Sequence, residues 1–261
     1  MAETFRDILG SLESLTIVIS QQTNEKAAIM NTNATPEPTV SIEEEPAKTL
    51  DSEASETREQ IRRQVLAERA ALPKPYRLHK SSAICDELET SLAITCATIG
   101  IDPPACTIAV YAAFEEEVQL DQFIRAAYAQ GARVAFPCIV EDAWSLEGAL
   151  QQTMEMRLVS PETYEKDEVP FIAHPLRKYH HDDEALRDFP YVAANELTMI
   201  VIPLVAFDAQ RNRLGYGGGN YDRYLPQLGK DCRQIAVAFS EQEVPFIPAE
   251  EHDVPVTVLA K

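Results

Sequence analysis

Apolar and polar positions alternate with a helical period at several places after residue 56. From Thr57 to Leu72 the apolar residues recur on one side of a helix. Thr57 belongs to the residue types that commonly cap a helix N-terminus, so we expect the helix to begin there. Further helices are expected over residues 76–92 and 119–130, the latter ended by Gly131.

Short apolar runs with the length and composition of buried β-strands follow these helices. They cover residues 106–111, 133–137, 198–203, 234–239 and 254–259. Nearly continuous apolar strands separated by helices are typical of parallel sheets that are buried on both faces. We therefore predict an α/β fold, three-layer α/β/α, with a mainly parallel, Rossmann-like central sheet. Residues 141–196 are more polar and show no clear period, so no element is predicted there.

The N-terminal part of the chain differs in composition from the rest. Residues 1–56 carry three basic and eleven acidic side chains. Residues 21–56 are rich in Asn, Thr, Glu and Pro and have little to bury, which favours disorder. Residues 5–19 are more apolar and fit either a short docking helix or a marginal, fraying one. We assign 1–56 to an acidic, largely disordered extension and 57–261 to one folded domain.

Charge and cysteine usage exclude several classes of protein. The net charge of −19 argues against a nucleic-acid binder, which needs clustered Lys and Arg for phosphate contacts. No apolar run reaches the length of a membrane span, and the N-terminus lacks the features of a secretion signal. The five cysteines form no CxxC pair, so we expect small buried apolar residues in a reducing compartment. The expected protein is cytoplasmic and monomeric, contacts no membrane, and acts on small molecules.

The segment from Arg213 to Arg223 contains the most informative motif. Four of the nine glycines of the chain fall between Gly215 and Gly219, after an apolar strand and before a predicted helix over 221–228. Glycine permits positive φ and close approach of backbone N–H groups to an anion, and a helix N-terminus adds a favourable dipole. Arg213 supplies a cation and Asp222 a hard oxygen ligand suited to Mg²⁺. The spacing fits neither G-x-G-x-x-G nor a Walker loop, and the alternative is a plain glycine-rich turn.

These residues resemble the signature of the 5-formyltetrahydrofolate cyclo-ligase family. The matching run is Val201-Ile-Pro-Leu-Val-Ala-Phe-Asp208 followed by Asn212-Arg-Leu-Gly-Tyr-Gly-Gly-Gly-Asn-Tyr-Asp-Arg223. Further matches follow the family order: Arg58-Glu-Gln-Ile-Arg62 with Arg69, Tyr111 before Glu117-Val118, Phe136-Pro137, and Pro248 before His252-Asp253. The resemblance covers about residues 57–261 and makes this part a cyclo-ligase-like catalytic domain.

The resemblance implies an activity with ATP and Mg²⁺ as cofactors. The family converts 5-formyltetrahydrofolate to 5,10-methenyltetrahydrofolate and releases ADP and phosphate. It implies catalytic roles for Arg213 and Asp222, and Mg²⁺ ligands at Asp222 and Asp253. The implied ATP-binding residues are Arg58, Arg62, Arg213, Leu214, Gly215, Tyr216, Gly217, Gly218, Gly219, Asn220 and Tyr221. The implied folate-binding residues are Glu117, Tyr216, Gly218 and Asn220.

Two departures from the family pattern leave an alternative open. Arg58 stands where the family usually has Lys, and Asn220 replaces a tyrosine that commonly precedes Tyr221-Asp222. Arg and Lys are not equivalent at a shaped anion site. The alternative is a folate- or nucleotide-binding paralogue with weak catalysis. Without the family match, Arg58 and Arg62 would fit a solvated helix face equally well.

Overall fold

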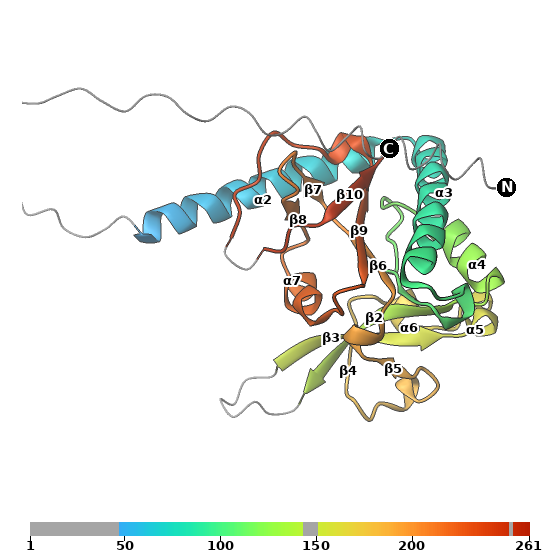
Figure 1. Cartoon of the computed structure of the whole chain (residues 1–261). Helices are drawn as coiled ribbons and strands as arrows, with labels where there is room; N and C mark the ends of the chain where they lie inside the picture. Colours follow the sequence, from blue (N-terminus) through green and yellow to red (C-terminus); the bar gives the residue numbers. More distant parts are fainter. Residues whose placement is uncertain (1–46, 143–150, 251–252) are drawn as a thin grey trace, which may run out of the picture. The chain divides into compact units, whose positions relative to one another are not determined.

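The computed structural model describes residues 47–142, 151–250 and 253–261 (Figure 1). The predicted disorder before residue 47 and the possible helix over 5–19 lie outside the described residues. Helix α2 spans Ala47–Ala71, so the expectation that a helix begins at Thr57 is wrong. Residues 47–56 contain no Gly or Pro and include several good helix formers, so nothing stops the helix before Thr57. A residue type that favours the N-cap marks the start of a helix only where the residues before it leave the helical conformation.

The other helices follow the predicted order with shifted ends. The second is α3 (Lys74–Ile99), which ends at Gly100 with φ of 72°. The third is α4 (Asp121–Ala129), followed by Gly131 with φ of 83°, as expected of a C-terminal cap. Shorter helices are α5 (Pro161–Glu165), α6 (Pro170–Ala173) and α7 (Asn220–Tyr224), with 3₁₀ turns η1 (Pro103–Ala105), η2 (Glu184–Leu186), η3 (Ala194–Glu196), η4 (Leu225–Gln227) and η5 (Ser240–Gln242).

Among the described residues, the main sheet has eight strands in the order β10-β9-β6-β1-β2-β3-β5, with β4 paired to β2. The strands are β1 (Thr107–Ala109), β2 (Arg133–Asp142), β3 (Gln151–Val159), β4 (Lys178–Tyr179), β5 (Tyr191–Val192), β6 (Met199–Pro203), β9 (Arg233–Ala238) and β10 (Thr257–Ala260); β7 (Ala206–Phe207) and β8 (Arg213–Leu214) form a separate hairpin. The five strands from β10 to β2 are all parallel, whereas β3 is antiparallel to β2 and β5. The predicted mainly parallel α/β fold is confirmed. The antiparallel edge comes from residues 141–196, for which the pattern predicts no element.

The strands place large and small side chains on opposite faces of the sheet. On one face Ile108, Val201 and Val237 pack with Leu88 of α3 and Phe123 of α4. The residues next to them along the strands point to the other face, because side chains alternate along a strand. They are mostly small and pack near α7: Ala109, Ala135, Ile200, Ile202, Ala236 and Ala238. Helices thus cover both faces, α3 and α4 on one and α7 on the other, which confirms the three layers (Figure 1).

The hairpin of β7 and β8 carries the glycine-rich segment and is held from two sides. In its turn, the buried Asp208 carboxylate accepts hydrogen bonds from the backbone N–H groups of Gln210, Asn212 and Ile247 at 2.9–3.0 Å. On the other side, Val65 of α2 packs into a buried cluster with the hairpin. The segment that follows β8 therefore starts from a fixed position next to α2.

All five cysteines are buried and none forms a disulfide, as expected for small apolar residues. Burial raises the pKa of Cys138 and of Cys232 to about 12, so both remain thiols at neutral pH. In the part of the chain that the structure describes, no helix combines the length and hydrophobicity needed to cross a membrane.

Candidate functional site

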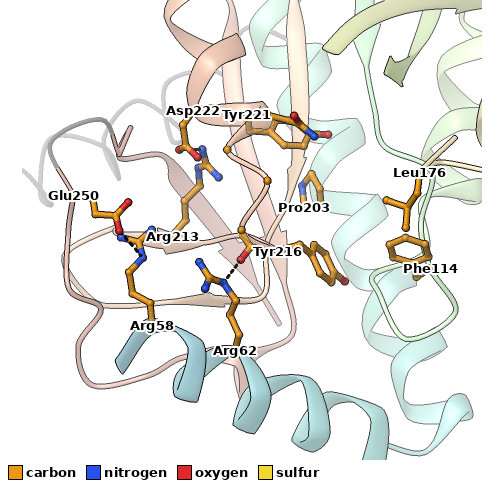
Figure 2. Close-up of a pocket in the computed structure, with 15 residues that line it drawn as sticks. Arg58, Arg62, Phe114, Leu176, Pro203, Arg213, Tyr216, Tyr221, Asp222 and Glu250 are labelled. Atoms are coloured by element: carbon orange, nitrogen blue, oxygen red, sulfur yellow. Dashed lines mark hydrogen bonds and ion pairs between the residues drawn. The ribbon is translucent and has the colours of Figure 1, made fainter. Parts of the chain in front are cut away.

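A cavity of about 620 Å³ opens beside the glycine-rich segment (Figure 2). It is lined by Arg58, Arg62, Phe114, Leu176, Pro203, Arg213, Gly215, Tyr216, Gly217, Gly218, Gly219, Asn220, Tyr221, Asp222 and Glu250. Figure 2 shows an apolar side with Phe114 and Leu176. It shows a charged side with Arg58, Arg213 and Asp222. The cavity can therefore hold a molecule, or two molecules, with one apolar and one strongly anionic part.

The glycine-rich segment adopts a backbone that only glycine tolerates well. Gly217 has φ of 97° and Gly219 has φ of 62°, both in the left-handed region. Gly219 precedes α7, which has five residues rather than the longer helix predicted over 221–228. Pro226 follows closely and the chain continues as the 3₁₀ turn η4. Because α7 is so short, its dipole contributes little, so an anion at this segment would be held mainly by backbone N–H groups and arginines.

Arg213 and Asp222 form an ion pair across the segment. Arg213 belongs to β8 and its side chain is almost fully buried. Its Nη2 donates a hydrogen bond to Asp222 Oδ1. Burial lowers the pKa of Arg213, and the charges of Asp222 and Asp253 act in the opposite direction. The guanidinium is thus a fixed cation whose position is set by the hairpin.

Arg58 of α2 binds a carboxylate near the C-terminal end of the chain. Its Nη1 donates to Asp253 Oδ2 at 2.7 Å and to the Pro248 carbonyl at 2.8 Å, and its Nη2 lies 3.3 Å from Asp253 Oδ1. Both side chains are only 8% exposed. Burial acts to lower the pKa of Arg58, but the hydrogen bond and charge of Asp253 outweigh it, so the pKa is raised. The pair anchors α2 to the chain around residue 250.

Arg62, one helical turn after Arg58, contacts the glycine-rich segment directly. Its Nε donates to the Gly215 carbonyl at 2.9 Å, and its Nη1 lies 3.1 Å from Glu59 Oε2. The guanidinium lies so close to Gly217 that a Cβ there would be 3.6 Å from the Arg62 Cζ. Arg62 therefore supports the segment from below and keeps donors free toward the cavity.

Glu117 lies behind the cavity wall and is 4% exposed. Its Oε1 accepts a hydrogen bond from the Tyr216 hydroxyl at 2.7 Å, and its Oε2 accepts one from the Phe114 N–H at 2.9 Å. The buried Arg69 guanidinium lies 3.8 Å from Oε1 and donates to the Tyr216 hydroxyl at 2.6 Å. Burial raises the pKa of Glu117, while these donors and Arg69 act to lower it. A buried carboxylate whose pKa is shifted by burial and by specific partners, beside a cavity, is a common feature of functional sites.

The predicted Mg²⁺ ligands, Asp222 and Asp253, both contact arginines on the charged side of the cavity. Among the described residues, no three His, Cys, Asp or Glu side chains are grouped so that they could hold a metal ion by themselves. Mg²⁺ usually takes one or two protein carboxylates and completes its octahedron with phosphate oxygens and water. The donor set therefore fits an ion that arrives with a nucleotide.

Most of the predicted site residues are brought together, and three lie outside the cavity wall. Leu214 is fully buried with Val65 in the cluster under the hairpin, so only its backbone is near the segment. Glu117 lies behind Tyr216, and Asp253 lies at Arg58. Asn220 lines the cavity, and its Oδ1 accepts a hydrogen bond from Arg223.

Several residues of the site were not among the predicted ones. Arg69 had a usable signal, because Arg58, Arg62 and Arg69 recur at intervals of four and seven and share one helix face. The others are Phe114, Leu176, Pro203 and Glu250. Of these, Pro203 ends the predicted strand over 198–203, and the remaining three come from segments outside helices and strands, where no period points to a site.

Comparisons with known proteins bear on the family of this chain. The sequence model of the 5-formyltetrahydrofolate cyclo-ligase family matches residues 54–260. The 5-formyltetrahydrofolate cyclo-ligase of Mus musculus is 28% identical over 157 residues, which is 57% of this chain and 70% of that protein. The enzyme of that name from Haemophilus influenzae is 46% identical over 63 residues, and the aligned part is 24% of this chain and 34% of that protein.

A solved structure extends the match over most of the fold. It is described as a 5,10-methenyltetrahydrofolate synthetase from Mycoplasma pneumoniae, with 25% identity and a TM-score of 0.54. The alignment covers 77% of this chain and 96% of that chain. The resemblance inferred from the glycine-rich segment is confirmed, and the chain belongs to the 5-formyltetrahydrofolate cyclo-ligase family.

Proposed function

We propose that this protein uses ATP to convert 5-formyltetrahydrofolate to 5,10-methenyltetrahydrofolate, releasing ADP and phosphate. The observation that carries the proposal is the two-sided cavity, in which arginines and the glycine-rich segment lie opposite an apolar wall. A nucleoside triphosphate fits the charged side, and the pterin and aminobenzoyl rings of a reduced folate fit the apolar side. The γ-phosphate and the formyl group then meet near the middle of the cavity.

The reaction needs ATP because an amide oxygen is a poor leaving group. The formyl oxygen attacks the γ-phosphorus and ADP leaves. The N5-formyl group is then an imidate phosphate, whose carbon is a better electrophile than the carbon of an amide. N10 then attacks that carbon, loses its proton, and phosphate departs with the former formyl oxygen. Phosphoryl transfer depends mostly on positioning and neutralisation of charge. The site supplies these through fixed cations rather than through an acid or a base.

The residues of the charged side have distinct roles in this proposal. Arg213, held by the hairpin, stabilises charge on the transferring phosphoryl group. Arg62 and the N–H groups of the glycine-rich segment bind the phosphate oxygens. Asp222 and Asp253 bind Mg²⁺, which neutralises phosphate charge when it is present. Arg58 keeps Asp253 in place and contributes positive charge.

Glu117 is the residue we assign to the pterin. A pterin presents an amino group and a ring N–H side by side, and a carboxylate accepts both with its two oxygens. Glu117 is the carboxylate at the apolar end of the cavity, next to Phe114 and Tyr216. Its low exposure strengthens such hydrogen bonds, since the local dielectric is low.

The test measures methenyl product by its near-ultraviolet absorbance and ADP from the same preparation. The proposal expects equal amounts of both, dependent on Mg²⁺. Asp222→Asn should lose at least about 100-fold in turnover, as expected when a charged group at the transferring phosphoryl is removed. Asp86→Asn, at an exposed position of α3, should turn over like the wild type. Folate binding without ADP release would instead establish the weakly catalytic paralogue.

A further inference from the structure

The Tyr216 hydroxyl is hydrogen-bonded to Glu117, the carboxylate that we assign to the folate. Its hydroxyl donates to Glu117 Oε1 at 2.7 Å and accepts from Arg69 Nη2 at 2.6 Å. The hydroxyl is thus held between two buried side chains, although Tyr216 as a whole is 47% exposed and lines the cavity. Glu117 itself does not line the cavity and is linked to it by this bond to Tyr216.

Glu117 cannot bind Tyr216 and a pterin in the same way at once. Its Oε2 is engaged by the Phe114 N–H at 2.9 Å, so Oε1 is the oxygen on the Tyr216 side. Glu117 does not line the cavity, whereas Tyr216 does, so a pterin that enters from the cavity meets the Tyr216 hydroxyl on Oε1 before it reaches the carboxylate. Binding of such a ligand to Glu117 therefore displaces this hydroxyl.

The surroundings of Tyr216 allow this movement. Tyr216 stands between Gly215 and Gly217, and Gly217 has a positive φ of 97°. Its ring touches Phe114 only edge-on, with ring centroids 5.9 Å apart. Arg69 lies 3.8 Å from Glu117 Oε1 and stays to neutralise the carboxylate when the hydroxyl leaves. Release of Tyr216 breaks hydrogen bonds without exposing an uncompensated buried charge.

We infer that Tyr216 is an internal competitor for the folate: its hydroxyl satisfies Glu117 in the free protein and is displaced by the pterin. The inference rests on the proposed function, because it takes Glu117 as the pterin-binding residue. In this role Tyr216 lowers the affinity of the protein for reduced folates. In the free protein it provides the buried Glu117 carboxylate with a hydrogen-bond donor. A direct folate contact by the hydroxyl would have the opposite effect on affinity.

The experiment titrates the full-length protein with 5-formyltetrahydrofolate by calorimetry, without ATP, so that no turnover occurs. Tyr216→Phe removes the competing hydroxyl and should bind the folate about tenfold more tightly than the wild type. Tyr216→Met should change affinity in the same direction, and it carries the test if the Phe variant does not fold. Tyr76→Phe is the matched control, because the Tyr76 hydroxyl also lies 2.7 Å from a glutamate, Glu241, away from the cavity. Its affinity should equal that of the wild type.

Glu117→Gln separates failure of this inference from failure of the proposed function. Weaker binding by Glu117→Gln together with unchanged or weaker binding by Tyr216→Phe overturns the competitor role alone. Wild-type affinity in Glu117→Gln, or no folate binding by the wild type, overturns both. In the double variant the gain from Tyr216→Phe should shrink to within about twofold, because its target is gone.

Discussion

The ion pair between Arg58 and Asp253 should contribute strongly to stability. Arg58→Met removes a guanidinium that donates to both Asp253 oxygens and to the Pro248 carbonyl. The two side chains are 8% exposed, so the substitution takes a directly bonded cation from a buried carboxylate. Removing one partner of a buried pair costs about 3–5 kcal/mol. In a domain of this size, a loss of about 3 kcal/mol lowers Tm by about 6–12 °C.

Urea unfolding followed by circular dichroism would measure this cost. Arg125→Met serves as the control, because its partner Glu165 and Arg125 itself are both more than half exposed, and such pairs contribute about 1 kcal/mol or less. Adding Asp253→Asn to Arg58→Met should recover about 2 kcal/mol, since the buried charge is then removed. A cost below about 1 kcal/mol for Arg58→Met, or no recovery in the double variant, would refute the assignment.

Two further changes test the buried carboxylate and the glycine backbone. The folded-state pKa of Glu117 is raised from 4.5, so ionisation of Glu117 in the folded state lowers stability. The Tm of the wild type, relative to that of Glu117→Gln, should therefore fall as pH rises from 4.5 through the folded pKa toward 8. A Tm difference independent of pH would contradict this. Gly217→Ala places a side chain at φ of 97° and should lower the free energy of unfolding by about 1–3 kcal/mol. Gly215→Ala is the control: this position has space for a Cβ and no positive φ, so the cost should be less than about 1 kcal/mol. Equal costs would show that the backbone of the segment differs from the one described.

The elements that build the sheet could be read from the sequence because their patterns are local. The strands β1, β6 and β9 are continuous apolar runs, and each is buried on both faces. The start of α2 could not be read, because a capping residue type at Thr57 signals a boundary only when the preceding residues disfavour a helix. The antiparallel strand β3 was also missed. It pairs with β2 from Val134 to Asp142, so it uses nearly the whole of that strand. Met154, Met156 and Leu158 alternate with polar residues in β3, but this short signal lies within a largely polar region.

The site was predictable where chemistry is concentrated in one segment. Between Arg213 and Asp222 the chain carries the glycines, the cation and the carboxylate together, so their proximity follows from the sequence. The apolar wall was not predictable, since Phe114 and Leu176 come from separate loops and meet only in the folded chain. The hydrogen bond between Tyr216 and Glu117 joins positions 99 residues apart, so it too could not be predicted from the spacing of residues along the chain.

The proposed function requires a strongly acidic protein to accept an anionic nucleotide, and the charges of the site indicate how it would do so. The chain has a net charge of −19, so its overall field repels phosphate. In the described structure, Arg58 and Arg213 are each matched by an aspartate, which leaves the cavity without a large local excess of positive charge. A Mg²⁺-loaded triphosphate offers phosphate oxygens to the arginines and a cation to Asp222 and Asp253, so every ion pair that opens is replaced. Free triphosphate would bring its negative charge toward the same two carboxylates without bringing a cation for them. Under the proposed function we therefore expect the Mg²⁺ complex to bind more tightly than the free nucleotide.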